Sequence, residues 1–159
     1  MEKIEKISDL KNRFHTGVEK LSSSTEELTK EEILAHPIVG KWSIQECVCH
    51  IVDFESVIHE RMKRIIALDN PLLLGADENR FAERLFYNNR NIQEEIQLYK
   101  YLRLQMFPIL DNLSNSDYDR TGVHNEAGKV TLLDMLERAC VHTEHHWRFI
   151  QEKRKALGK

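Results

Sequence analysis

The sequence contains few residues that interrupt helices or cross-link a chain. Its 159 residues include six glycines, three prolines and three cysteines. No stretch shows the alternation of apolar and polar residues that is typical of a half-buried strand, so little argues for a β-sheet protein. The cysteines, Cys47, Cys49 and Cys140, cannot all pair with one another, and none are spaced as C-x-x-C. This argues for reduced thiols in a cytoplasmic protein.

The sequence also lacks long apolar runs and a strong excess of charge. No segment is long and apolar enough to span a bilayer, and residues Met1–Lys6 lack the apolar core of a signal peptide. A net charge of -3 and an isoelectric point of about 6.2 give no basic field for nucleic acid or an anionic membrane. With 41% hydrophobic residues, the chain suits one domain, residues 1–159, with its own apolar core.

The chain is predicted to be almost entirely helical. Long helices are expected over about 8–21, from the N-cap Ser43 to about 68, over about 92–113, and from the N-cap Thr131 to about 155. Short helical segments are expected after Thr29 and over 79–83, and loops over 112–117 and 121–128. Four principal helices with a short extra helix in a connector predict an all-α four-helix bundle.

Three histidines on two of these helices are the strongest functional signal. His142 and His146 are four residues apart, so they lie on one helix face with an axial rise of about 6 Å. A helical wheel places both inside or beside the apolar arc, and it places His145 nearer the polar side. His50 lies on the flank of the apolar arc of the helix that follows Ser43. Two imidazoles at this spacing can bind one divalent metal, and a third from a facing helix would complete a three-histidine site with an open position.

These histidines also have a purely structural interpretation. A histidine on an apolar flank is more often a hydrogen-bonded core residue than a ligand, and the chain has eight histidines from which a chance H-x-x-x-H pair can arise. The inward placement of both His142 and His146 favours a metal, because two adjacent buried imidazoles without a shared partner are unfavourable when either is protonated. For His124, in a glycine-flanked loop, a place in a cavity wall and an exposed position remain equally open.

Other polar residues near these histidines have two interpretations as well. Asp53, Glu46 or Glu144 could orient the imidazoles or relay protons. Glu46 is also explained as the partner of Ser43 in a capping box, and Glu144 projects to the polar side of its helix. The basic run Arg61–Arg64 is expected to be a solvated helix face.

Three segments taken together resemble the DinB-like (YfiT-like) superfamily of helical metal-binding proteins. They are Gly40–Glu46 leading into His50, Arg120–His124 with Gly128–Leu132, and His142–His146. The resemblance extends from about Gly40 to the end of the chain, with the segments in the expected order. It implies an up-down-down-up bundle in which His50, His142 and His146 hold a divalent metal, and imidazole ligands suit zinc or nickel.

The resemblance also implies a range of activities. Some relatives are transferases or isomerases that use a low-molecular-weight thiol, bacillithiol or mycothiol, and others are regarded as metal-dependent hydrolases. We therefore expect a metal-dependent thiol S-transferase or hydrolase that acts on a small-molecule substrate as a homodimer, without nucleic-acid or membrane partners. The alternative is a non-enzymatic, stress-related metal-binding protein. An open coordination position would favour the enzyme, and a fourth protein ligand would favour the alternative.

Overall fold

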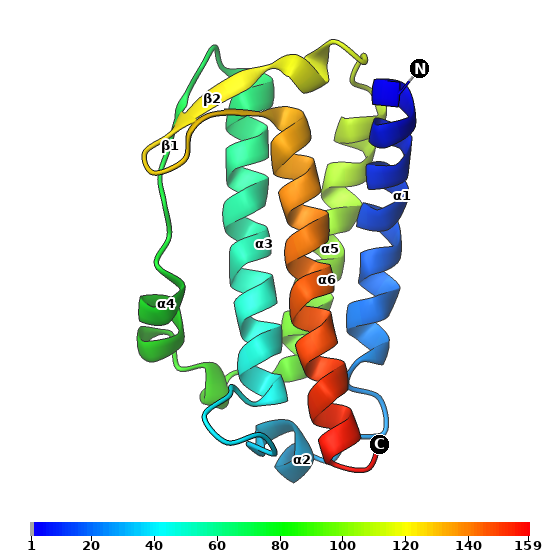
Figure 1. The fold of residues 1–159 in the computed structure, drawn as a ribbon, viewed down its shortest axis with the longest axis vertical. Coiled ribbons are helices and arrows are strands. Elements are labelled where there is room, and N and C mark those ends of the chain that lie inside the picture. The colour runs from blue at the N-terminus through cyan, green and yellow to red at the C-terminus, as the bar shows by residue number, and fades with distance from the viewer. Residues whose placement is uncertain (1) are drawn as a thin grey trace.

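The computed structural model describes residues 2–159, which form a bundle of four long helices (Figure 1). The long helices are α1 (Glu2–Ser23), α3 (Ile44–Ala67), α5 (Ile92–Asp111) and α6 (Leu132–Ala156). Both α1 and α3 pack against α5 and α6. In Figure 1, α1 and α6 run in one direction, and α3 and α5 run in the other. The predicted four-helix bundle with up-down-down-up topology is confirmed.

The connectors are shaped by this topology. Because α3 and α5 are parallel, the chain must return along the bundle between them, and this crossover contains β1 (Leu72–Leu73), α4 (Glu78–Arg84) and the 3₁₀ turn η1 (Tyr87–Asn89). The helix α2 (Lys30–Leu34) lies between α1 and α3, and η2 (Asp117–Asp119) follows α5. The short helices expected after Thr29 and over 79–83 are therefore confirmed. None of the helices within residues 2–159 has the length and apolar character needed to cross a membrane.

The prediction that residues 121–128 form a loop without strands is wrong, because a small sheet forms there. β1 pairs in parallel with β2 (Thr121–His124), and β2 pairs antiparallel with β3 (Gly128–Thr131). The amide of Val123 donates to the carbonyl of Pro71 at 2.8 Å, which joins two segments far apart in the sequence. Strands of two to four residues are too short to show an alternating pattern, and tertiary pairing stabilises them. The helix expected from about residue 8 also begins earlier, since tertiary contacts such as that from the Lys3 ammonium to the Asn115 carbonyl hold its first turn.

Capping boxes fix where the two histidine-bearing helices begin. The Ser43 hydroxyl accepts from the Glu46 amide at 3.1 Å, and the Glu46 carboxylate accepts from the Ser43 amide at 2.7 Å. Thr131 and Asp134 make the same reciprocal pair at the start of α6, at 3.0 and 2.8 Å. Both predicted starts are confirmed. Each cap satisfies amides that the first helical turn leaves unpaired, and it sets the register of the histidines that follow.

The apolar core is interrupted by one polar layer near the middle of the bundle. Buried residues on each long helix recur at intervals of three and four, as in Ile96, Tyr99, Arg103, Met106 and Leu110 of α5. In the middle of the bundle, one position of each stripe holds no large apolar side chain. These positions are Gly17 on α1, Glu55 on α3, Arg103 on α5 and Thr143 on α6.

Arg103 connects all four helices through this layer. Its guanidinium is fully buried and donates to both carboxylate oxygens of Glu55, at 2.8 and 3.1 Å. It also donates to the Thr143 hydroxyl at 2.9 Å, and to the carbonyls of Ala139 at 3.2 Å and Phe14 at 2.5 Å. A buried charge is tolerated only when it is paired and hydrogen-bonded, and Arg103 meets both conditions.

Gly17 provides the space that Arg103 occupies. A Cβ atom at this position would lie 2.3 Å from Nη1 of Arg103 and 3.3 Å from the Tyr99 hydroxyl. The guanidinium cannot move aside easily, because Glu55 and Thr143 hold it from the other helices. The requirement for glycine here is therefore steric.

We predict that Gly17→Ala destabilises the protein by about 1–3 kcal/mol, as overpacking of a fixed core does. At an unconstrained helical site the same change stabilises by about 0.5–1 kcal/mol, so the sign is diagnostic. Urea unfolding measures the effect. The exposed Asn12→Ala on the same helix is the control and should change stability by less than about 0.5 kcal/mol. A Gly17→Ala variant as stable as the wild type would contradict the steric account.

Candidate metal centre

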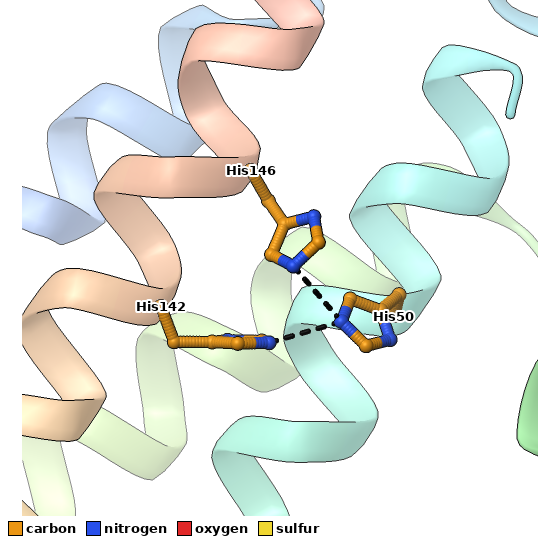
Figure 2. Close-up of side chains that lie close together, drawn as sticks. All are labelled: His50, His142 and His146. Carbon is orange, nitrogen blue, oxygen red and sulfur yellow. Dashed lines mark hydrogen bonds between the residues drawn. The ribbon is translucent and has the colours of Figure 1, made fainter. Parts of the chain in front are cut away.

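The structure brings the three predicted histidines together between α3 and α6. Figure 2 shows His50 from α3 facing His142 and His146 from α6. Nε2 of His50 lies 2.9 Å from Nε2 of His142 and 3.1 Å from Nε2 of His146. One ring nitrogen from each residue falls within 4.8 Å of the others. His145 is exposed, as the helical wheel indicates.

The donor set fits a divalent metal. A neutral imidazole nitrogen either donates one hydrogen or presents one lone pair, so Nε2 of His50 cannot satisfy both of its neighbours. A metal ion accepts a lone pair from all three. Tetrahedral zinc with Zn–N bonds of about 2.0–2.1 Å would need nitrogens roughly 3.3 Å apart. The observed separations of 2.9 and 3.1 Å are close to this value.

The surroundings keep these imidazoles neutral. Burial lowers the pKa of His50 to about 3, and the neighbouring His142 lowers it further. Burial also lowers the pKa of His142 to about 4. For His146, burial and the nearby His142 and His50 lower the pKa to about 2. At neutral pH the three rings therefore keep the lone pairs that a metal requires.

Two aromatic residues flank the histidine cluster. The ring of Trp42 lies 5.0 Å from that of His50 and stacks on His146 at 6.4 Å. Phe54 lies 4.6 Å from His50 and stacks on His142 at 5.6 Å. These rings help to bury the imidazoles, and burial is the main cause of the low pKa values of the three histidines.

The three carboxylates considered from the sequence are engaged elsewhere. Asp53 accepts two hydrogen bonds from Arg90, at 2.9 Å each, and Glu46 caps α3. Glu144 pairs with Arg13 of α1 at 2.7 Å, so it contacts a neighbouring helix instead of projecting into solvent. Within residues 2–159, the Nδ1 atoms of the three clustered histidines have no hydrogen-bond partner. The hypothesis that these carboxylates orient the imidazoles is wrong.

Two residues near the cluster had no clear signal in the sequence. A carboxylate oxygen of Glu78, on α4, lies 3.9 Å from Nε2 of His50, although that side chain is 58% exposed. Arg61 was expected to be solvated, yet it is buried and donates to the carbonyl of Leu74 at 3.1 Å. Both positions depend on how the crossover after α3 folds back, which helical periodicity cannot reveal.

Cavities border the cluster on two sides. One, the His142 cavity, has a volume of about 220 Å³ and is lined by His142, Phe54, Arg61, His124 and Arg138, with Glu78 and Glu126 among its other residues. The other, the His146 cavity, has a volume of about 260 Å³ and is mostly apolar, lined by His146, Ile38, Trp42, Cys47 and Phe149 among others. His124 is only 5% exposed, so the first of its two interpretations, a place in a cavity wall, is confirmed.

We predict that the metal-free protein loses stability as the pH falls from about 6.5 toward 4. In this range the unfolded chain takes up protons at His50, His142 and His146 while the folded chain does not, so unfolding becomes more favourable. Burial alone would raise the pKa of Glu55, but Arg103 and His59 outweigh it and lower the value to about 2. The contribution of Glu55 is therefore lost only at lower pH.

Urea unfolding of the metal-free protein at pH 7, 6 and 5 measures this dependence. A variant with all three histidines changed to glutamine is the control, and its stability should vary less with pH over the same interval. An equal dependence in the wild type and the control would show that the clustered histidines are not its source.

Comparisons with known proteins agree with the fold and identify the family. Residues 13–150 match the sequence profile of the DinB superfamily. A protein of Oceanobacillus iheyensis, named as a proposed metal-dependent hydrolase, is 27% identical over 126 residues, which cover 79% of this chain and 73% of the relative. A Bacillus licheniformis protein with the same proposed activity is 25% identical over 153 residues, covering 96% of this chain and 85% of that one.

Two solved structures share the fold. YfiT from Bacillus subtilis, described as a proposed metal-dependent hydrolase with an unusual four-helix bundle topology, superposes with a TM-score of 0.88. The match covers 96% of this chain and 87% of YfiT, at 20% sequence identity. A mycothiol-dependent maleylpyruvate isomerase matches with a TM-score of 0.70 at 12% identity, over 89% of this chain and 59% of the isomerase. With the family profile matching most of the sequence and the bundle topology in place, the chain belongs to the DinB superfamily.

Proposed function

We propose that this protein is a metal-dependent enzyme in which His50, His142 and His146 hold one divalent ion, zinc or nickel. Its reaction is the transfer of a small thiol to a small electrophile, or the hydrolysis of that electrophile. Three neutral imidazoles leave the ion its full charge, which lowers the pKa of a thiol or water that reaches it. A homodimer remains a prediction from the family resemblance.

The observation that carries this proposal is a cluster of only three protein donors with a cavity on either side. No fourth histidine, cysteine or carboxylate within residues 2–159 joins the group. Glu78 comes nearest, 3.9 Å from Nε2 of His50, but its side chain is largely exposed. Catalytic metal sites keep an open position and structural sites do not. This arrangement therefore favours the enzyme over a non-enzymatic metal-binding protein.

The nucleophile comes from a bound molecule and not from a protein cysteine. Cys47, Cys49 and Cys140 are all buried and unpaired. Burial raises the pKa of the Cys47 thiol to about 11 and those of Cys49 and Cys140 to about 12. Since the thiolate is the reactive form, these residues are inert at neutral pH.

The two cavities favour thiol transfer over hydrolysis. A hydrolase needs one organic substrate besides water, whereas a thiol transferase needs two. Both cavities border the same cluster, but the His146 cavity is mostly apolar, whereas the wall of the His142 cavity includes two arginines and two glutamates. Hydrolysis remains the second candidate, supported by the activity proposed in the names of the curated relatives.

We predict that the purified protein binds about one zinc or nickel ion per chain. His50→Ala, His142→Ala and His146→Ala should each weaken binding by roughly two orders of magnitude or more, because each removes one of three ligands. Isothermal titration calorimetry and elemental analysis measure the affinity and the stoichiometry. The bundle should still fold in each variant, since its apolar core lies mostly outside the cluster.

His145→Ala is the matched control, because it removes an exposed imidazole next to His146. It should retain nearly the wild-type affinity. Loss of binding in His145→Ala together with normal binding in His142→Ala would refute the site.

We further predict that the metal-loaded protein accelerates the reaction of a thiol with 1-chloro-2,4-dinitrobenzene. The thiolate sulfur forms a bond to the ring carbon, the carbon–chlorine bond breaks, chloride leaves, and the thiol proton passes to solvent. Absorbance of the thioether product measures the rate, and His142→Ala should abolish the acceleration. Metal-dependent hydrolysis of 4-nitrophenyl acetate with no thiol acceleration would decide for the second candidate.

A further inference from the structure

The wall of the His142 cavity contains three hydrogen-bond donors that come from three different elements. Arg61 lies on α3, His124 ends β2, and Arg138 lies on α6 one turn before His142. They belong to segments far apart in the sequence and meet only because the small sheet folds over the bundle. None of these three residues belongs to the histidine cluster.

The hydrogen bonds of His124 settle which of its ring nitrogens carries the proton. Its Nδ1 accepts from the amides of Glu126 and Ala127, at 3.2 Å each. Two backbone amides can point at this atom only if it presents its lone pair, so the proton of the neutral ring lies on Nε2. Nε2 is buried and has no acceptor within residues 2–159. Burial, with the nearby Arg61 and Arg138 charges, lowers the pKa of His124 and keeps it neutral.

The two arginines have no acidic partner. Arg61 is 5% exposed and donates only to the carbonyl of Leu74, a neutral acceptor. Arg138 is an exposed residue of the cavity wall, and no hydrogen bond or ion pair joins it to another residue between 2 and 159. Burial and, to a smaller extent, the nearby Arg138 charge lower the pKa of Arg61, while the charges of Glu60 and Glu126 oppose this shift. Such a pair is stabilised by an anion placed between its members.

We propose that the His142 cavity binds the carboxylate of a small organic anion, held by Arg61, Arg138 and the Nε2–H of His124. This inference rests on the proposed function in taking that anion as one of the reactants. A carboxylate can accept from a guanidinium on one oxygen and an imidazole on the other. Its organic part would then lie beside His142, next to the ion.

The acidic residues of the cavity favour a carboxylate over a phosphate. Glu78 and Glu126 also line it, and neither lies within 4.0 Å of Arg61 or Arg138. Glu78 is directed to His50, and the Glu126 carboxylate lies against Gly75. Neither glutamate pairs with the two arginines, but the negative charge of the glutamates disfavours an anion that carries two charges on one group. A singly charged carboxylate fits this balance better.

The experiment titrates the metal-free and the zinc-loaded protein with glutarate, inorganic phosphate and uncharged glutaramide at constant ionic strength. The NMR signal of the His124 ring, labelled with ¹⁵N, reports occupation of the cavity without any activity assay. We expect glutarate to shift this signal saturably in both forms, phosphate to bind more weakly, and glutaramide to have no effect. Binding to the metal-free form excludes simple ligation of zinc by glutarate.

Arg138→Gln should weaken glutarate binding about tenfold or more, because it removes a charged donor. Arg148→Gln is the matched control, since Arg148 is an exposed arginine of the same helix, as Arg138 is, but does not line the cavity. It should change the affinity less than about twofold, because a distant exposed charge is screened by salt. Arg138→Lys should fall between the two, since it keeps the charge and loses the planar donor pair.

Equal losses in Arg138→Gln and Arg148→Gln would overturn the proposal, as would tighter binding of phosphate or equal binding of glutaramide. The zinc stoichiometry of the same samples separates this outcome from a failure of the proposed function. A protein that binds zinc but not glutarate keeps its metal centre and loses the anion site. One that binds glutarate but no zinc keeps the cavity and loses the metal-dependent function.

Discussion

The arrangement of the bundle depends on one buried ion pair, between Arg103 of α5 and Glu55 of α3. A guanidinium enclosed by four helices is costly unless it is paired and hydrogen-bonded, and here the Thr143 hydroxyl and the carbonyls of Ala139 and Phe14 add to the pair with Glu55. These partners lie at fixed heights on α1, α3 and α6, so the helices cannot slide past one another without leaving a charge unpaired. An apolar layer would tolerate such a shift much better.

The same contacts place the histidines. Thr143 follows His142 directly, and Glu55 lies little more than one turn beyond His50. A register that satisfies Arg103 therefore also brings His50 opposite His142 and His146. From the rest of the bundle the three rings are held by packing, since Trp42 and Phe54 flank them and, within residues 2–159, their Nδ1 atoms have no hydrogen-bond partner. The polar layer supplies directional contacts next to a site whose own side chains have few.

Helical periodicity and capping explain what could be predicted from the sequence. The starts at Ser43 and Thr131 follow from local capping boxes, and the inward faces of His142 and His146 follow from a spacing of four. A charged residue in the apolar stripe of α5 marks Arg103 as unusual, but its pairing with Glu55 across 48 residues cannot be read from either helix alone. Short strands, the burial of Arg61 and the approach of Glu78 depend on tertiary pairing in the crossover, which has no local pattern.

The long helices and the connectors have different roles within this small domain. The residues that would hold a metal lie on long helices whose register is fixed by the polar layer and the caps. In the His142 cavity, His124 of the small sheet and the carboxylates of Glu78 and Glu126 come from connectors, whereas the two arginines lie on α3 and α6. A change in a connector can alter the cavity without moving the histidines, because no connector residue takes part in the layer around Arg103. A bundle that matches YfiT at a TM-score of 0.88 with only 20% identity is consistent with a rigid frame of this kind. Metal chemistry would then depend on the helices, and the choice of reactant would depend also on the segments that join them.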